Sequence, residues 1–348
     1  MEENSVINGA STRSSQIASE DGPHVPRPNQ LDVQVGDVLQ ASPWATLESD
    51  PGVFTELAEK LGIKGIQVEE LFGLQEEFFG PLKPIYGLIF LFQWRSSDTE
   101  ECDLEGEVPE GLMFMNQVVN NACATQALLS IALNCDFLDI GDELTRFKEF
   151  TKDFSPAMKG LTLSNSHVLR TAHNSFSRQT DMPVLDYPVP KSSPRKRKRK
   201  RNGDDDEDED NGFHFISYVP FKGNVWEIDG LKRVPKALGS IPAGCDWVDV
   251  VQPAIQERMQ CYANEAIQFN LMAVVKDRLL TLQIQLEEQR TASAPTRATE
   301  LAIADEHRRR EEYRAENQRR RFNYTPFIKK FLEMLMEKGL VDDILFPS

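Results

Sequence analysis

The sequence has 348 residues, a formal net charge of −16 and an ordinary share of charged residues. This length predicts one large domain or two, and the apolar content is sufficient for a substantial core. The negative charge argues against general nucleic-acid binding, and no apolar stretch is long enough to span a membrane.

Five cysteines are scattered through the chain without a CxxC pair or a Cys/His cluster. An odd, dispersed set is typical of a reducing compartment, where a reactive thiol survives. We therefore expect no zinc site, and the sequence predicts no cofactor.

Residues 1–43 are rich in Ser, Asn, Pro and acidic residues, which predicts a disordered leader. Asp50 and the Pro-Gly pair after it then predict the start of a helix that ends at Gly62. The apolar spacing of this helix, which includes Phe54 and Leu57, favours packing against the core.

The next element is a nearly continuous apolar run from Tyr86 to Trp94. Its length and composition predict a central strand that is covered on both faces. The acidic, turn-rich residues 95–111 predict a surface loop.

A buried helix is predicted between Asn120 and Asn134, because Ala, Leu and Ile fill this run. Asn120 or Asn121 can cap its start. Cys123 then lies in the first turn, where unpaired N–H groups and the helix dipole favour a thiolate. The alternative is that Cys123 is only a small buried side chain at a helix start.

Two helices are expected after it, one through Leu144, Phe147 and Phe150 and another from about Asn165 to Ser177. Two strands follow farther along, Phe213–Val219 and Trp226–Leu231, and the Gly-Asn pair between them suits a hairpin turn.

That hairpin would place His214 and Asp229 on neighbouring strands, where the carboxylate can orient the imidazole. Upstream, the Gln117 amide could donate to an oxyanion on a carbonyl attacked by Cys123. Cysteine, histidine and aspartate in this order, with a glutamine before the cysteine, form a complete thiol-hydrolase set. His167 and His173 are rival bases by residue type, but neither lies in a strand beside a carboxylate.

Residues 178–212 contain four prolines, an unbroken basic run at 195–201 and an unbroken acidic run at 204–210. Neither run can be buried, so this segment predicts disordered low-complexity sequence. The basic run favours nuclear import, because the acidic run would weaken phosphate binding. A nucleic-acid patch and a solvated charge run without a role are the alternatives.

Asp246-Trp247 begins a helix predicted to end near Tyr262, and the strand-like run Ile267–Val275 closes the globular part. Residues 277–289 and 296–320 are helical and heavily charged, with Pro295 as the break. A solvated helix face explains most of the arginines in this region. After Pro326 comes an apolar helical stripe that needs a partner or its own domain to cover it.

Together, residues Asn116–Asn134, Phe213–Val219 and Trp226–Leu231 resemble the ubiquitin C-terminal hydrolase family of cysteine peptidases. The resemblance runs from about Trp44 to about Lys338. Four further stretches resemble the long-tailed, proteasome-associated branch of that family: Glu48–Phe54, Gly87–Phe92, Met158–Leu161 and Asn323–Ile328.

This resemblance implies an α+β, papain-like fold with a knotted backbone, in which helices flank a central antiparallel sheet. It implies a catalytic domain at residues 44–276 and a helical C-terminal docking domain at 277–348. Segment 178–212 would then be a disordered insertion in the crossover above the active site. In the family, the helix that starts at Pro51 lies at the ubiquitin-binding face.

The implied activity is hydrolysis at the C-terminal glycine of ubiquitin, with Cys123 as nucleophile, His214 as base, Asp229 orienting the imidazole and Gln117 holding the oxyanion. The implied partners are ubiquitin and, through the tail, a ubiquitin-receptor subunit of the proteasome, in nucleus and cytoplasm. The sequence ends at Ser348 without the Lys/Glu-rich extension of long members, one clear departure from the branch.

Three other function classes remain open from the sequence. The chain could be an inactive ubiquitin-binding scaffold that works through its tail, although the intact set of four residues argues against this. It could be an enzyme held inactive until the tail meets its partner. A nucleic-acid binder built on residues 195–201 is the third, and the acidic balance disfavours it.

Overall fold

The computed structural model describes residues 43–93, 106–178, 213–263 and 269–338. The predicted leader, the first part of the acidic loop and the charged insertion lie outside the described residues. The predictions made for those segments therefore stay predictions.

Six strands form a single antiparallel sheet. The strand predicted from the apolar run near Tyr86 is confirmed, and it pairs with a strand on either side. Across the sheet the order is β1 (Ile66–Glu70), β6 (Phe269–Lys276), β2 (Ile85–Gln93), β3 (Phe213–Phe221), β4 (Asn224–Ile228) and β5 (Lys236–Ser240).

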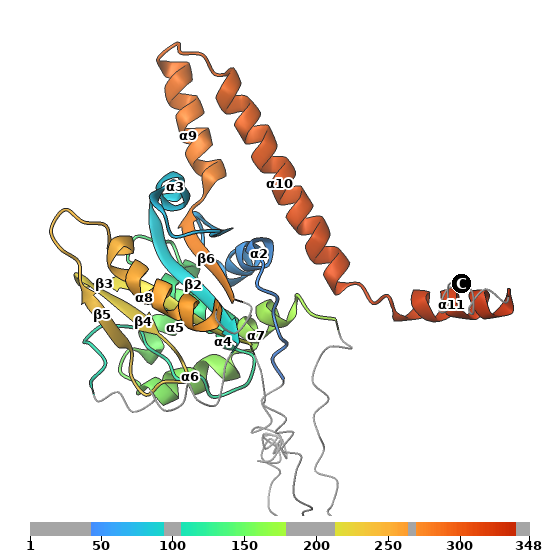
Figure 1. Cartoon of the computed structure of the whole chain (residues 1–348), viewed down its shortest axis with the longest axis horizontal. Helices are drawn as coiled ribbons and strands as arrows, with labels where there is room; N and C mark the ends of the chain where they lie inside the picture. The colour runs from blue at the N-terminus through green and yellow to red at the C-terminus, as the bar shows by residue number, and fades with distance from the viewer. Residues whose placement is uncertain (1–42, 94–105, 179–212, 264–268, 339–348) are drawn as a thin grey trace, which may run out of the picture. The chain divides into compact units, whose positions relative to one another are not determined.

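Both faces of this sheet are buried, which explains the continuous apolar run in β2. Ile89 belongs to the core under α2 (Pro51–Leu61) and α4 (Cys123–Ala132). Its neighbours Leu88 and Phe90 belong to a second core under α8 (Trp247–Ala263). Figure 1 shows α8 in front of the strands. Alternation along a strand thus supplies one residue set to each core.

Helix α2 begins and ends as predicted. Asp50 caps its start, with one carboxylate oxygen accepting from the N–H groups of Gly52 (2.9 Å) and Val53 (3.1 Å). Gly62 ends it in the left-handed conformation, with φ of 87°. Phe54 and Leu57 are fully buried, so the packing interpretation is confirmed for both side chains.

Helix α5 (Gly141–Thr151) is confirmed, and the helix predicted from about Asn165 to Ser177 is confirmed at residues 167–174, whereas the helix before it was not predicted. Two helices, α6 (Pro156–Asn165) and α7 (His167–Asn174), meet at Ser166. Its hydroxyl accepts from the N–H of Leu169 (3.3 Å) and caps α7. The short elements α3 (Glu76–Phe79), η1 (Gly80–Leu82) and β5 were not predicted.

Three helices follow β6: α9 (Arg278–Thr291), α10 (Arg297–Arg321) and α11 (Thr325–Glu337). Helix α10 packs against α9 and against α2 (Figure 1). At α2 the ring of Tyr313 lies so close to Gly52 that a Cβ there would be 2.7 Å from the ring. The two helices can approach this closely only because residue 52 has no side chain.

The prediction that most of these arginines form a solvated face was wrong for four of them. Along α10, Arg309 and Arg310 reach acidic groups near the sheet edge, while Arg320 and Arg321 reach the start of α2. Their acidic partners come from segments more than 30 residues away, which periodicity alone cannot show. Arg308 and Arg319, by contrast, are mainly exposed.

Arg309 makes the most complete of these contacts. Its two terminal nitrogens donate to the two carboxylate oxygens of Glu69, at 2.8 and 2.6 Å. It also pairs with Glu306, whose side chain is almost wholly buried. Burial lowers the pKa of Arg309, but these carboxylates outweigh it and raise the pKa. This ion group therefore fastens α10 to β1.

Helix α11 carries the predicted apolar stripe. Phe327 and Phe331 stack with ring centroids 6.1 Å apart, and both are half exposed or more. No residue of α11 is buried within the described chain. Among the described helices, none has the length and apolar character needed to cross a membrane.

We expect Arg309→Ala to lower the free energy of unfolding by about 3 kcal/mol, because it leaves Glu69 and Glu306 near one another without their shared cation. Arg308→Ala is the matched control. That neighbour pairs only with Asp305 on the surface, so its loss should cost less than about 0.5 kcal/mol. Thermal and urea unfolding of both variants measure the difference, and equal losses would contradict the prediction.

Candidate active site

Cys123 is the first residue of α4 and is mostly buried. The predicted asparagine cap was wrong, because Ala122 takes the cap position and no side chain caps the helix. Asn121 instead adopts a left-handed conformation, with φ of 65°, and its amide donates to the carbonyl of Trp44 (3.0 Å). At this position the Cys123 N–H has no intrahelical acceptor and is available to an oxyanion.

The β3–β4 hairpin brings His214 and Asp229 together, as predicted. Lys222 and Gly223 form its turn with positive φ values of 47° and 75°, which suits tightly paired strands. The Nε2 of His214 lies 2.7 Å from Oδ1 of Asp229, and both side chains are buried. Asp229 also accepts from the N–H of Leu231 (2.9 Å), which holds the carboxylate in place.

The Cys123 thiol also interacts with His214 and raises its pKa, so the three predicted residues lie together. Burial lowers the pKa of His214, but the bonds to Asp229 and Cys123 outweigh it and raise the pKa to about 9. Burial likewise raises the pKa of Asp229, but its bond to His214 reverses this and lowers the pKa. The imidazole is therefore positively charged at neutral pH.

Because Nε2 bonds to Asp229, Nδ1 is the nitrogen that can exchange a proton with the Cys123 sulfur. The carboxylate thereby selects both the tautomer and the plane of the ring. This is the arrangement needed for a thiol nucleophile with an oriented base.

The backbone N–H of Gln117 donates to the carbonyl of Gly230 (2.8 Å), the residue directly after Asp229. Its neighbour Asn116 is braced on two sides: its N–H donates to the Pro156 carbonyl (3.0 Å) and its amide to the Lys232 carbonyl (2.8 Å). The side-chain oxygen of Gln117 is buried and lacks a partner among the described residues. The predicted oxyanion role of Gln117 remains a prediction.

Neither rival histidine contacts Cys123 in the described contacts. His173 is fully buried, with Nδ1 2.7 Å from the Thr125 hydroxyl and Nε2 2.7 Å from the Ala45 carbonyl. Burial lowers its pKa to about 4, and the bond to Ala45 offsets only part of this. His173 is thus a neutral structural link between α7, α4 and the segment before α2, and His167 is exposed at the start of α7.

A cavity of about 360 Å³ opens at Cys123. One wall is the segment from Thr46 to Ser49, and the opposite walls come from the starts of β3 and β6. No local pattern in the sequence predicts that this wall segment and the β6 residues line the site, because only the folded sheet places them beside Cys123. The lining residues are Thr46, Leu47, Glu48, Ser49, Leu91, Asn121, Cys123, Ala124, Phe213, Phe215, Phe269 and Asn270.

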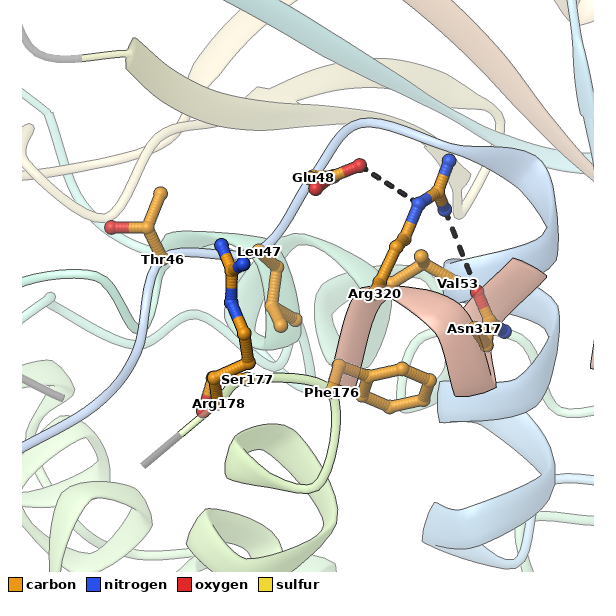
Figure 2. Close-up of a pocket in the computed structure, with 9 residues that line it drawn as sticks. All are labelled: Thr46, Leu47, Glu48, Val53, Phe176, Ser177, Arg178, Asn317 and Arg320. Carbon is orange, nitrogen blue, oxygen red and sulfur yellow. Dashed lines mark hydrogen bonds and ion pairs between the residues drawn. The ribbon is translucent and has the colours of Figure 1, made fainter. Parts of the chain in front are cut away.

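A second, smaller cavity of about 60 Å³ is lined by part of the same wall segment and by residues of α10 (Figure 2). There Arg320 of α10 reaches Glu48 at 3.0 Å and Asp50 at 3.0 Å. Thr46, Leu47 and Glu48 line both cavities. The segment that forms this wall of the Cys123 cavity therefore also contacts the C-terminal end of α10.

Comparison with known proteins agrees with this geometry. The family model described as "Ubiquitin carboxyl-terminal hydrolase, family 1" matches residues 44–260. The chain belongs to the ubiquitin carboxyl-terminal hydrolase family. It is accordingly a cysteine peptidase of the deubiquitinating class, with a papain-like fold. A second model, "Ubiquitin carboxyl-terminal hydrolases", matches residues 297–340 and so covers all of α10 and α11.

Similar proteins match over most of their length. "Ubiquitin carboxyl-terminal hydrolase ubh-4" of Caenorhabditis elegans is 41% identical, over 87% of this chain and 90% of its own. "Ubiquitin carboxyl-terminal hydrolase isozyme L5" of Dictyostelium discoideum is 38% identical, over 87% and 94%. The crystal structure of Trichinella spiralis UCH37 bound to ubiquitin vinyl methyl ester matches with a TM-score of 0.62 and 36% identity, over 78% of this chain and 99% of that one.

We expect Asp229→Asn to lower the pKa of His214 from about 9 to below its usual 6.5, because the charge that raises it is lost while burial remains. In the native protein, the stability due to this shift is fully present below pH 6.5 and is lost as the pH rises through 9. The variant should lack that dependence.

Histidine NMR titration of both proteins measures the shift directly. Asp139→Asn is the control, since Asp139 is exposed and pairs with Lys64 on the surface. A His214 pKa near 9 in Asp229→Asn would contradict the assignment of Asp229 as the orienting carboxylate.

Proposed function

We propose that Cys123, His214 and Asp229 are the catalytic residues of this deubiquitinase and that Gln117 assists them. The observation that carries the proposal is that the buried His214 hydrogen-bonds to Asp229 and interacts with the Cys123 thiol, which lines a cavity. The substrate is ubiquitin linked through its C-terminal glycine. The ubiquitin adduct of the similar Trichinella protein supports this substrate.

The first half of the reaction transfers the ubiquitin acyl group to sulfur. In the resting pair the Cys123 proton already lies on Nδ1 of His214, and the thiolate attacks the glycine carbonyl carbon. The Cys123 N–H and the Gln117 amide donate to the resulting oxyanion. His214 then protonates the departing amine, the C–N bond breaks, and a thioester remains.

In the second half, water hydrolyses this thioester. His214, now neutral, takes a proton from the water as it attacks the same carbonyl carbon. The C–S bond breaks and Cys123 leaves as a thiolate beside the imidazolium. A raised pKa at His214 suits this cycle, because the imidazolium stabilises the thiolate between turnovers.

The inactive-scaffold alternative is disfavoured by the same observation. A chain kept only for binding would have no need of a buried imidazole held between a thiol and a carboxylate. The nucleic-acid alternative rests on residues 195–201, which lie outside the described residues. A role for residues 195–201 in nuclear import, and hence a location in nucleus and cytoplasm, stays a proposal.

We expect ubiquitin vinyl methyl ester to form one covalent adduct with the full chain, mapped to Cys123 by peptide mass spectrometry. Cys123→Ala should form none and should not hydrolyse a fluorogenic ubiquitin amide. Cys135→Ala is the matched control and should react normally, since Cys135 lies three residues beyond the last residue of α4 and outside the residues that line the Cys123 cavity. An adduct that persists in Cys123→Ala would overturn the nucleophile assignment.

We further propose that α11 docks on a ubiquitin-receptor subunit of the proteasome and that chain editing occurs there. The exposed apolar stripe of α11, the second family model and the resemblance to the proteasome-associated branch support this. An amphipathic helix with its apolar face uncovered fits a groove on a partner protein.

We expect Phe331→Asp to abolish co-sedimentation with purified proteasomes, because it places a charge in the middle of the stripe. Lys330→Ala, one residue away on the polar side, is the control and should bind normally. Hydrolysis of a ubiquitin amide by the free enzyme should change less than twofold in both variants. Undiminished co-sedimentation of Phe331→Asp would contradict docking through α11.

A further inference from the structure

His214 has a third neighbour besides Cys123 and Asp229. Phe92 lies opposite His214 in the β2–β3 ladder, and the two rings meet edge to face, with centroids 5.7 Å apart and planes at 88°. Phe92 is fully buried. An edge-to-face contact restricts rotation of the imidazole, because a rotated ring would collide with the aromatic face or lose contact with it.

Phe92 is itself packed against a charged side chain. The guanidinium of Arg258, from α8, lies 5.0 Å from the Phe92 ring centre. A planar guanidinium stacks on an aromatic face better than an ammonium does. Arg258 therefore supports the ring that contacts His214.

The same arginine also contacts the strand that presents the carboxylate. Its Nη2 donates to Oε1 of Glu227 at 2.8 Å, and both side chains are largely buried. Glu227 lies in β4, two residues before Asp229, and pairs with Tyr218 across the β3–β4 ladder. Arg258 is thus joined through Phe92 to the imidazole and through Glu227 to the strand of its carboxylate.

A buried ion pair by itself is weak evidence for stabilisation, since its desolvation can exceed the attraction. A placement that connects both halves of the His214–Asp229 pair is a stronger indication of function. We propose that Arg258, through Phe92 and Glu227, is a positioning residue that fixes the ring plane of His214 between Cys123 and Asp229. The inference rests on the catalytic roles proposed above for these three residues.

The consequence concerns the chemical step and not substrate binding. Neither Arg258 nor Glu227 is among the described residues that line the Cys123 cavity. A loosened ring spends less time aligned with the sulfur, so kcat should fall while KM stays near its native value. The charged groups around His214 are Cys123 from α4, Asp229 after β4 and, behind Phe92, Arg258 with Glu227.

The test compares Arg258→Lys with the native enzyme. Lysine keeps the charge beside Glu227 but loses the planar stack on Phe92. We expect kcat for a fluorogenic ubiquitin amide to fall about tenfold with KM within about twofold. The acid limb of the pH profile for Cys123 alkylation by iodoacetamide should move to higher pH, because a misaligned imidazole supports the thiolate less well.

Val251→Ala is the matched control, because Val251 lies on α8 in the same core and its truncation destabilises that core without touching the ion pair. It should lower the melting temperature and leave the alkylation profile unchanged. Should Arg258→Lys fail to fold, the double variant Glu227→Gln/Arg258→Met removes both charges together, and the same shift is expected. A native alkylation profile and native kcat in the folded Arg258 variant would overturn the proposal.

His214→Ala separates this inference from the proposed function. If His214→Ala abolishes turnover while Arg258→Lys changes neither kcat nor the profile, only the positioning role of Arg258 fails. If His214→Ala keeps native turnover, the catalytic assignment itself fails and the positioning role falls with it.

Discussion

A buried imidazole that keeps its positive charge is the constraint on which the site depends. Burial alone leaves a histidine neutral, as it does for His173, whose pKa is lowered to about 4. His214 is almost as buried, yet its pKa is raised to about 9. The difference lies in the partners: His173 meets a hydroxyl and a backbone carbonyl, whereas His214 meets a carboxylate and a thiol. One chain thus holds one buried histidine neutral and another positively charged.

The fold must therefore deliver Asp229 to His214 accurately, and it does so through sheet register. The two-residue turn pairs residues 217–221 of β3 with 224–228 of β4, which places Asp229 directly after the last paired residue of β4 and near His214. Gly230 then permits a close approach, because a Cβ there would collide with the side chain of Gln126. Gly160 of α6 likewise lets the loop before α4 approach closely, because a Cβ at Gly160 would collide with the Asn116 carbonyl. Small residues and short turns produce the precision that the chemistry needs.

Much of this was predictable from the sequence, where local signals sufficed. Alternating residues around His214, the turn residues after it and the apolar run after Cys123 indicate their elements directly. The asparagine cap was wrong because Asn121 bonds to Trp44, a residue 77 positions away. The wall segment at Thr46 was missed for the same physical reason. Contacts between distant segments leave no periodic trace in the chain.

The arginines of α10 show most clearly how tertiary contacts override a local pattern. A helix this charged is indistinguishable in sequence from one exposed on all sides, and Arg308 and Arg319 are indeed solvated. Arg320, one residue farther along, instead pairs with Glu48 (Figure 2) and with Asp50. Glu48 also lines the Cys123 cavity, so this ion pair links the cavity wall to α10. Segments near both ends of the described chain therefore meet beside the nucleophile cavity.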